Sequence, residues 1–134
     1  MKKHITNNDL IDQAYNEAIL IVRNCSHPVG MKASGLTKGY PQVWARDSMI
    51  TLLGASLIND SKVTRSLKAS FNILKKKQSS LGSIPNNVDV KSLKPNFQAY
   101  ADSGLWFVIG NAFFFKQTND KKFLRSNYTA IKKL

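Results

Sequence analysis

Apolar residues recur at helical spacing along most of the chain. Between residues 8 and 23 they fall three or four positions apart, which predicts an amphipathic helix. Residues 48–58 are apolar on almost all sides, as in a helix that several neighbours bury. Three more helices are predicted: from the Asp60 cap to the lysine run at 75–77, over 103–117, and after the Asp120 cap. The pattern indicates helical hairpins laid side by side, an all-α fold of about five helices.

Two segments lack a helical period. Residues 26–40 are rich in glycine, which predicts a loop with room for short strands. Residues 79–101 show neither helical nor strand periodicity, and loops of about twenty residues are uncommon inside compact domains. This second segment is too apolar for plain disorder, so we expect it to fold over another part of the protein.

The composition fits one domain with a single core over residues 1–134. No apolar stretch is long enough to cross a bilayer, and nothing resembles a secretory signal. Cys25 is the only cysteine and cannot form an internal disulfide, which favours a reducing, cytoplasmic location. Cys25 and His27 are too few ligands for a metal site, and both are predicted to lie in a loop.

The net charge of +12 raises the possibility of nucleic-acid binding, because clustered basic residues neutralise phosphates. Here the lysines are scattered in pairs and triplets at helix edges, and no aromatic residues interleave with them to stack bases. This distribution favours solvated helix faces. A basic helical nucleic-acid-binding protein therefore stays the least favoured alternative.

The segment Trp44-Ala-Arg-Asp47 sets a carboxylate near an indole at the start of an apolar helix. Arginine offers a planar fork of donors and aspartate a pair of acceptors, so together they can hold neighbouring sugar hydroxyls while Trp44 covers the apolar face of the ring. A structural explanation is also open. Asp47 could cap the helix, Arg46 could form a surface ion pair, and Trp44 could belong to the core.

The segment Asp102-Ser-Gly-Leu-Trp106 poses the same choice. As a helix cap, Asp102 would accept backbone N–H bonds and stay ionised, with a lowered pKa. As a general acid it must be protonated, so apolar neighbours such as Tyr100, Trp106 and Phe107 or a second carboxylate must raise its pKa. Periodicity does not decide between the two roles.

Together these motifs closely resemble those of the six-hairpin, (α/α)6-barrel glycosidases, in particular the amylo-α-1,6-glucosidase (glycogen-debranching) type and the related neutral/alkaline invertases. The segment from Gly39 to Ile50 resembles the family's Arg-Asp segment, and Ala101 to Phe107 resembles its Asp-(Ser/Ala)-x-Leu-Trp segment. Gly82-Ser-Ile-Pro-Asn86 is similar to the family's Gly-x-Ile-Pro-Asn loop, and Thr118-Asn-Asp120 to its Thr-Gly-Asp turn. The resemblance runs from about Gly30 to the C-terminus, with order and spacing kept.

The resemblance implies an inverting glycoside hydrolase that acts on α-glucosidic bonds in an oligo- or polysaccharide. Asp102 matches the family's general acid, and no metal or organic cofactor is implied. The substrate is a carbohydrate, held in a pocket that the 79–101 loop would wall. The residues expected to bind the sugar are Trp44, Arg46, Asp47, Asn86, Tyr100 and Trp106.

The chain departs from the family in one respect: the catalytic base, a downstream glutamate, has no counterpart. Glu17 is the only glutamate and lies in the first predicted helix. We therefore expect the N-terminal part of one catalytic domain, an incomplete (α/α)6 toroid that is inactive alone and needs a complementing C-terminal segment or chain. Such an open structure is expected to expose the apolar faces of Leu52, Phe113 and Phe114. The alternative is a non-catalytic carbohydrate-binding remnant.

Overall fold

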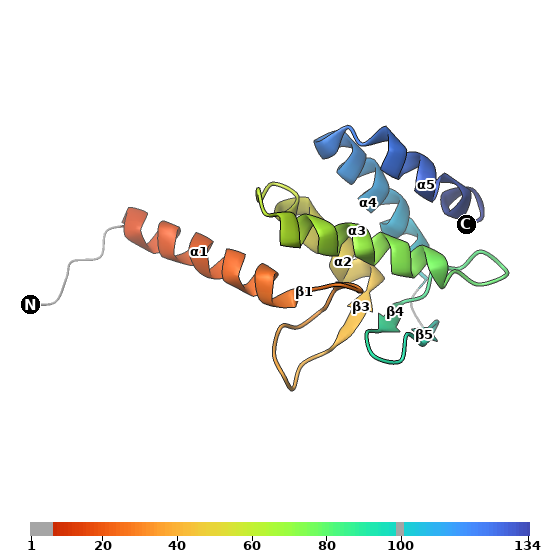
Figure 1. Cartoon of the computed structure of the whole chain (residues 1–134), viewed down its shortest axis with the longest axis horizontal. Helices are drawn as coiled ribbons and strands as arrows, with labels where there is room; N and C mark the ends of the chain where they lie inside the picture. Colours follow the sequence, from red (N-terminus) through yellow and green to blue (C-terminus); the bar gives the residue numbers. More distant parts are fainter. Residues whose placement is uncertain (1–6, 99–100) are drawn as a thin grey trace, which may run out of the picture.

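The computed structural model describes residues 7–98 and 101–134, and this part of the chain is mostly helical. Its helices are α1 (Asn7–Cys25), α2 (Ala45–Ala55), α3 (Ser61–Lys76), α4 (Ser103–Thr118) and α5 (Lys121–Lys132) (Figure 1). The expected all-α class with about five helices is confirmed. Figure 1 shows α4 and α5 as a hairpin on one side of α3, while α1 reaches away from the other helices.

Short strands join the helices. The segment after α1 forms a small antiparallel hairpin, as expected, from β1 (Ser26–His27) and β2 (Gly30–Met31). Residues 79–101 show no strand periodicity, yet they contribute β4 (Asn87–Asp89) and β5 (Pro95–Asn96), which form an antiparallel sheet with β3 (Gln42–Trp44) in the order β3-β4-β5. Strands of two or three residues are too short to show the alternation of apolar and polar residues that predicts a strand. They can be recognised only from the distant strands with which they pair.

Strand β3 also sets where α2 begins. Trp44 has extended backbone (φ −89°, ψ 137°) and pairs with Asn87 across the sheet, so the helix starts at Ala45, three residues before the predicted position 48. At the other end of the first loop, α1 continues to Cys25, which was expected in a loop. Partial burial raises the pKa of the Cys25 thiol above its ordinary value, which disfavours the thiolate form.

Phe71 of α3 lies at the centre of the core. Its ring packs against Phe107 and Phe114 of α4 and Phe123 of α5, with centroid distances of 5.7, 6.0 and 5.3 Å. Tilted and edge-on ring pairs add about 0.5–1.5 kcal/mol each beyond simple burial. Phe71 therefore holds α3, α4 and α5 together.

Gly110 lets α4 pack closely on α2. A Cβ atom at position 110 would lie 2.2 Å from Sδ of Met49 in α2 and 3.2 Å from the Phe71 ring. Met49 is 1% exposed, so its side chain has little free space to move into. The side-by-side packing of α2 and α4 thus depends on the missing side chain of Gly110.

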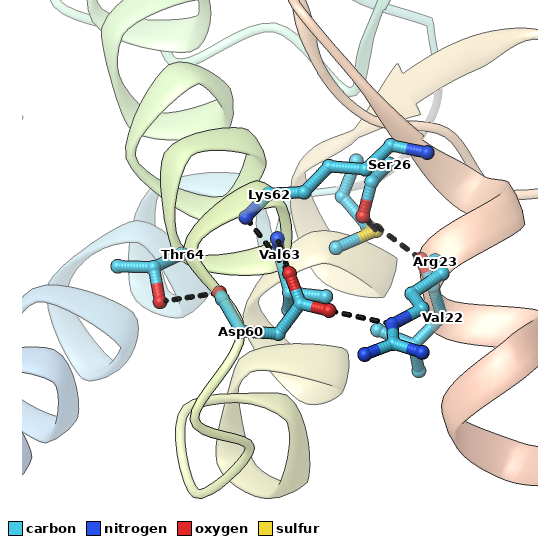
Figure 2. A network of polar contacts seen from close by, with 8 residues as sticks. Val22, Arg23, Ser26, Asp60, Lys62, Val63 and Thr64 are labelled. Atoms are coloured by element: carbon cyan, nitrogen blue, oxygen red, sulfur yellow. Dashed lines mark hydrogen bonds and ion pairs between the residues drawn. The ribbon is translucent and has the colours of Figure 1, made fainter. Parts of the chain in front are cut away.

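Asp60 caps the start of α3 and also forms an ion pair with α1 (Figure 2). One carboxylate oxygen accepts hydrogen bonds from the backbone N–H groups of Lys62 and Val63, which is the capping role expected of Asp60. The other oxygen forms an ion pair with Nε of Arg23 at 2.5 Å. The end of α1 is therefore held against the start of α3.

The apolar surface left open differs from the expected one. Leu52 and Phe114 are 0% and 1% exposed, and Phe113 packs partly buried against the core, so the expectation that these three would be exposed was wrong. Leu105 and Ile109 of α4 are exposed instead. A helix that is apolar on all sides does not itself reveal which side its neighbours cover. None of the described helices is long and apolar enough to cross a membrane.

The close packing at Gly110 can be tested by substitution. Gly110→Ala is expected to lower the free energy of unfolding by about 1–3 kcal/mol, because added atoms in a packed core push their neighbours apart. Gly54 of α2 is a matched control, since a Cβ atom there would have no neighbour within 4 Å. Gly54→Ala is expected to stabilise the helix by about 0.5–1 kcal/mol. Urea unfolding followed by circular dichroism measures both, and equal effects would contradict this packing.

Candidate functional site

The two sequence motifs meet at the starts of α2 and α4. Arg46 lies in the first turn of α2, and Asp102 immediately precedes α4. Nε of Arg46 and Oδ2 of Asp102 form an ion pair at 2.6 Å, although 56 positions separate the residues in the sequence. The fold thus joins the arginine of one motif to the carboxylate of the other.

A small pocket of about 140 Å³ opens around this ion pair. Five of the seven predicted site residues line it: Trp44, Arg46, Asp47, Asn86 and Asp102, together with Ser103. Trp106 does not line it but donates a hydrogen bond from Nε1 to Oδ2 of Asp102 at 3.1 Å. Tyr100 lies outside the described residues. The structure therefore gathers most of the predicted residues in one place.

Asn86 connects the elements that form the pocket. Its backbone C=O accepts from the N–H of Ala45 at the start of α2, at 2.8 Å. Its side-chain Nδ2 donates to Oγ of Ser103 at the start of α4, at 3.1 Å. Asn86 is 5% exposed, and the preceding Ile84 is in the core. The Gly-Ser-Ile-Pro-Asn loop therefore fixes the relative position of the two helix starts as well as lining the pocket.

Neither motif aspartate caps its helix. Trp44 occupies the cap position of α2, and Asp47 lies exposed in the first turn, so the capping explanation for Asp47 was wrong. Asp102 does occupy the cap position of α4, but its side chain makes no capping hydrogen bond. Its carboxylate binds the Arg46 and Trp106 side chains instead. Arg46 does form an ion pair, as the structural explanation proposed, but its partner belongs to the other motif.

The same contacts determine the ionisation of Asp102. The hydrogen bond from Arg46 is the main cause that lowers the pKa of Asp102 below its ordinary value, and the charge of Arg46 and the Trp106 N–H contribute further. A general acid needs the opposite shift. In this conformation Asp102 is therefore an ionised carboxylate at neutral pH.

Trp44 has an unusual environment for an indole. Its side chain is partly buried and lines the pocket, but its Nε1 atom is buried and has no hydrogen-bond partner among the residues that the structure describes. Buried N–H groups are nearly always paired with an acceptor. An acceptor placed in the pocket could satisfy this donor.

A larger hollow of about 390 Å³ lies beside the pocket and shares Asn86 and Ser103 with it. Its walls combine apolar side chains, including Leu81, Phe97 and Leu105, with polar ones such as Ser83. Sequence analysis did not identify this hollow. The one sequence feature that pointed to the hollow was the apolar character of the 79–101 segment. Its position beside α4 could not be inferred, because that position depends on the pairing of β4 with β3.

Among the described residues no group of three or more His, Cys, Asp or Glu side chains is arranged to hold a metal ion. Nδ1 of His27 accepts a hydrogen bond from the backbone N–H of Val29 at 3.2 Å, within the turn between β1 and β2. The His27 side chain therefore stabilises the turn between β1 and β2.

Fold and pocket together define an all-α protein with an arginine–carboxylate site rimmed by indoles. The sequence matches the family model described as amylo-alpha-1,6-glucosidase over residues 14–134. The chain therefore belongs to the amylo-alpha-1,6-glucosidase family. No curated protein matched the chain. No solved structure matched it either.

The role of Arg46 in the ionisation of Asp102 can be measured directly. Arg46→Gln removes both the Nε–H donor and the positive charge, so the pKa of Asp102 is expected to rise. Carboxyl carbon NMR titration measures this pKa. Arg65→Gln, which removes an exposed arginine of α3, is the matched control and should leave the pKa unchanged.

This pKa shift also makes stability depend on pH. Because the pKa of Asp102 is lower in the folded than in the unfolded chain, its contribution is present above the unfolded-state pKa. It is lost as pH falls through the folded-state pKa. Arg46→Gln should therefore lose less stability on acidification than the parent protein. An Asp102 pKa that stays equally low in Arg46→Gln would contradict this account.

Proposed function

We propose that this chain forms the part of a glycoside hydrolase that grips an α-glucoside and protonates its departing oxygen. The observation that carries the proposal is the convergence of both family motifs on one pocket around the Arg46–Asp102 pair. Membership of the amylo-alpha-1,6-glucosidase family supports α-glucosidic bonds in oligo- or polysaccharides as the substrate class.

In this proposal the pocket residues bind the sugar by complementary chemistry. The guanidinium of Arg46 donates to sugar hydroxyls and the carboxylate of Asp47 accepts from them. A sugar oxygen accepts from the buried Nε1–H of Trp44, which has no partner within the described part of the chain. The Trp44 indole, which lines the pocket, covers the apolar ring face, Trp106 acts on the sugar through the Asp102 carboxylate that it binds, and Asn86 and Tyr100 contact the sugar from the loop.

Asp102 would act as the general acid only after its surroundings change. When Arg46 turns from Asp102 to a sugar hydroxyl, the main cause of the lowered pKa disappears. A second carboxylate facing Asp102 would raise the pKa further, because two nearby negative charges repel each other. Substrate binding would therefore prepare the acid for its proton transfer.

The second carboxylate, a glutamate that activates water, would come from a complementing segment or chain. In inverting enzymes the two carboxyl groups lie about 6.5–9.5 Å apart, which leaves room for the water. We propose that residues 1–134 form the N-terminal part of one (α/α)6 catalytic domain, with a relation to the neutral/alkaline invertases. The domain would work in the cytoplasm without metal or cofactor.

Sugar binding by the chain is the direct test. Isothermal titration with a branched, α-1,6-linked maltooligosaccharide is expected to show binding that Trp44→Ala and Arg46→Gln weaken at least about tenfold, roughly the loss of one or two hydrogen bonds to a charged group. Tyr128→Ala and Arg65→Gln remove an exposed aromatic and an exposed arginine far from the pocket, and serve as matched controls. Absence of binding to every α-glucan tried would overturn the proposal.

Hydrolysis distinguishes the roles of the two pocket carboxylates. The 134-residue chain is expected to show no turnover, because Asp47 and Asp102 are the only carboxylates among the described residues that line the pocket. Release of glucose that Asp102→Asn abolishes would contradict the need for a further carboxylate.

A non-catalytic carbohydrate-binding module is the second candidate. The observation in its favour is the lowered pKa of Asp102, which suits a carboxylate that accepts hydrogen bonds. Sugar binding that survives Asp102→Asn, with no hydrolysis by any longer form of the protein, would support this module over the enzyme.

A further inference from the structure

Ser103, the first residue of α4, differs from the other buried serines of the described chain. Buried hydroxyl groups are nearly always paired. Ser103 is only 4% exposed, yet no described residue accepts a hydrogen bond from its hydroxyl group. Each of the other buried serines donates its hydroxyl hydrogen to a backbone C=O group: Ser26 to Val22, Ser48 to Met31, Ser66 to His27 and Ser70 to Ser66.

Within the described part of the chain, the Ser103 side chain acts as an acceptor. Its Oγ atom accepts from Nδ2 of Asn86 at 3.1 Å. A hydroxyl group has two lone pairs and one hydrogen, so this bond leaves the hydrogen available. Asn86 is itself 5% exposed, and its backbone C=O is bonded to the N–H of Ala45 at 2.8 Å. A well-anchored amide therefore fixes the position of Oγ, while the hydroxyl hydrogen has no acceptor among the described residues.

The position of Ser103 shows from where an acceptor can approach. Ser103 lines the pocket of about 140 Å³ around the Arg46–Asp102 pair, and it also lines the adjoining hollow. Asp102 lines the pocket but not the hollow. An acceptor bound in the pocket would therefore meet the Ser103 hydroxyl and the Asp102 carboxylate together.

The start of α4 also favours an acceptor beside Ser103. Asp102 occupies the cap position, but its side chain makes no capping hydrogen bond because its carboxylate binds Arg46 and Trp106. The first turn of the helix therefore keeps its positive partial charge without a capping bond from this carboxylate. An electron-rich oxygen next to Ser103 would be stabilised by this partial charge.

A sugar hydroxyl has the combination of groups that the pocket requires. Its oxygen can accept from Ser103, and its hydrogen can be donated to a carboxylate. The exposed carboxylate of Asp47 lines the same pocket. An anionic ligand would instead be repelled by the negative charges of Asp47 and Asp102. A neutral hydroxyl group is therefore the better partner for Ser103.

We propose that Ser103 is a specificity-determining residue, whose hydroxyl donates to one hydroxyl oxygen of the sugar bound beside the Arg46–Asp102 pair. This inference rests on the proposed function and adds to it a residue that sequence analysis did not single out. The pocket then selects α-glucosides that carry this hydroxyl group and rejects analogues that lack it. Such rejection is strong because the missing group leaves its partner in the protein unpaired.

Isothermal titration with deoxygenated sugars tests the proposal on the 134-residue chain. The parent ligand is isomaltose, an α-1,6-linked glucose disaccharide, and each analogue lacks one hydroxyl group of the non-reducing glucose. The unmodified chain is expected to bind at least one analogue about tenfold more weakly than isomaltose, because a buried hydroxyl group then loses its partner. Equal affinity for isomaltose and for every analogue would overturn the proposal without the need for a variant.

Ser103→Ala identifies the sugar hydroxyl concerned. This variant is expected to bind isomaltose about tenfold more weakly and to bind one analogue as well as isomaltose, since the two groups removed were partners. Ser126→Ala, at an exposed serine of α5 away from the pocket, is the matched control and should keep every affinity ratio of the unmodified chain. A purely structural role of Ser103 would weaken isomaltose and all analogues by the same factor. Unchanged ratios in Ser103→Ala would therefore overturn the proposal.

A second variant covers the case in which Ser103→Ala does not fold. Ser103→Cys keeps a side chain of similar shape with a much weaker donor, so it is expected to reduce the same affinity ratio. An unchanged ratio in folded Ser103→Cys would also count against the role of Ser103.

The outcomes distinguish this inference from the proposed function. Isomaltose binding with unchanged ratios in the Ser103 variants would overturn the role of Ser103 and leave the sugar site standing. No binding of isomaltose or of the branched maltooligosaccharide by the unmodified chain would overturn both.

Discussion

The close approach of α2 and α4 at Gly110 is the constraint on which the candidate site depends. With no side chain at position 110, Met49 fits against α4 and Phe71 reaches the rings of α4 and α5. The two helices then begin side by side, and Arg46 comes within 2.6 Å of Asp102. A packing contact in the core therefore determines an ion pair at the surface.

The arrangement of the site in the structure differs from the one that the proposed catalysis would require. Arg46 and Trp106 bind the carboxylate of Asp102 and keep it ionised. A protonated acid would need this arrangement to open, either when sugar competes for Arg46 or when another carboxylate approaches. In the proposed mechanism, binding and acid activation would occur in one event, because the same arginine would take part in both.

Much of the helical framework follows from the sequence. Asp60 and Asp120 were expected to cap α3 and α5, and both side chains accept backbone N–H bonds there. Asp47 and Asp102 are the same residue type at similar positions, yet neither forms a capping bond. The difference comes from distant partners: β4 pairs with β3 and moves the start of α2, and Arg46 competes for Asp102.

The grouping of the site residues was predictable only through the motifs, since local periodicity carries no information on which helix starts meet. The adjoining hollow could not be predicted, because it depends on strands of two or three residues, which are too short to show a sequence period. Which side of α4 is exposed could not be predicted either. Its apolar residues surround the helix, so its buried side depends on the neighbours that tertiary packing supplies.

The two indole N–H signals of the protein offer the most direct test of the central claim, that both motifs form one sugar-binding site. The chain has only two tryptophans, Trp44 and Trp106, one in each motif. Proton–nitrogen NMR during titration with a branched α-glucan oligosaccharide is expected to shift both signals with the same binding curve. Signals that stay unchanged at saturating sugar, or that follow different curves, would contradict a single shared site.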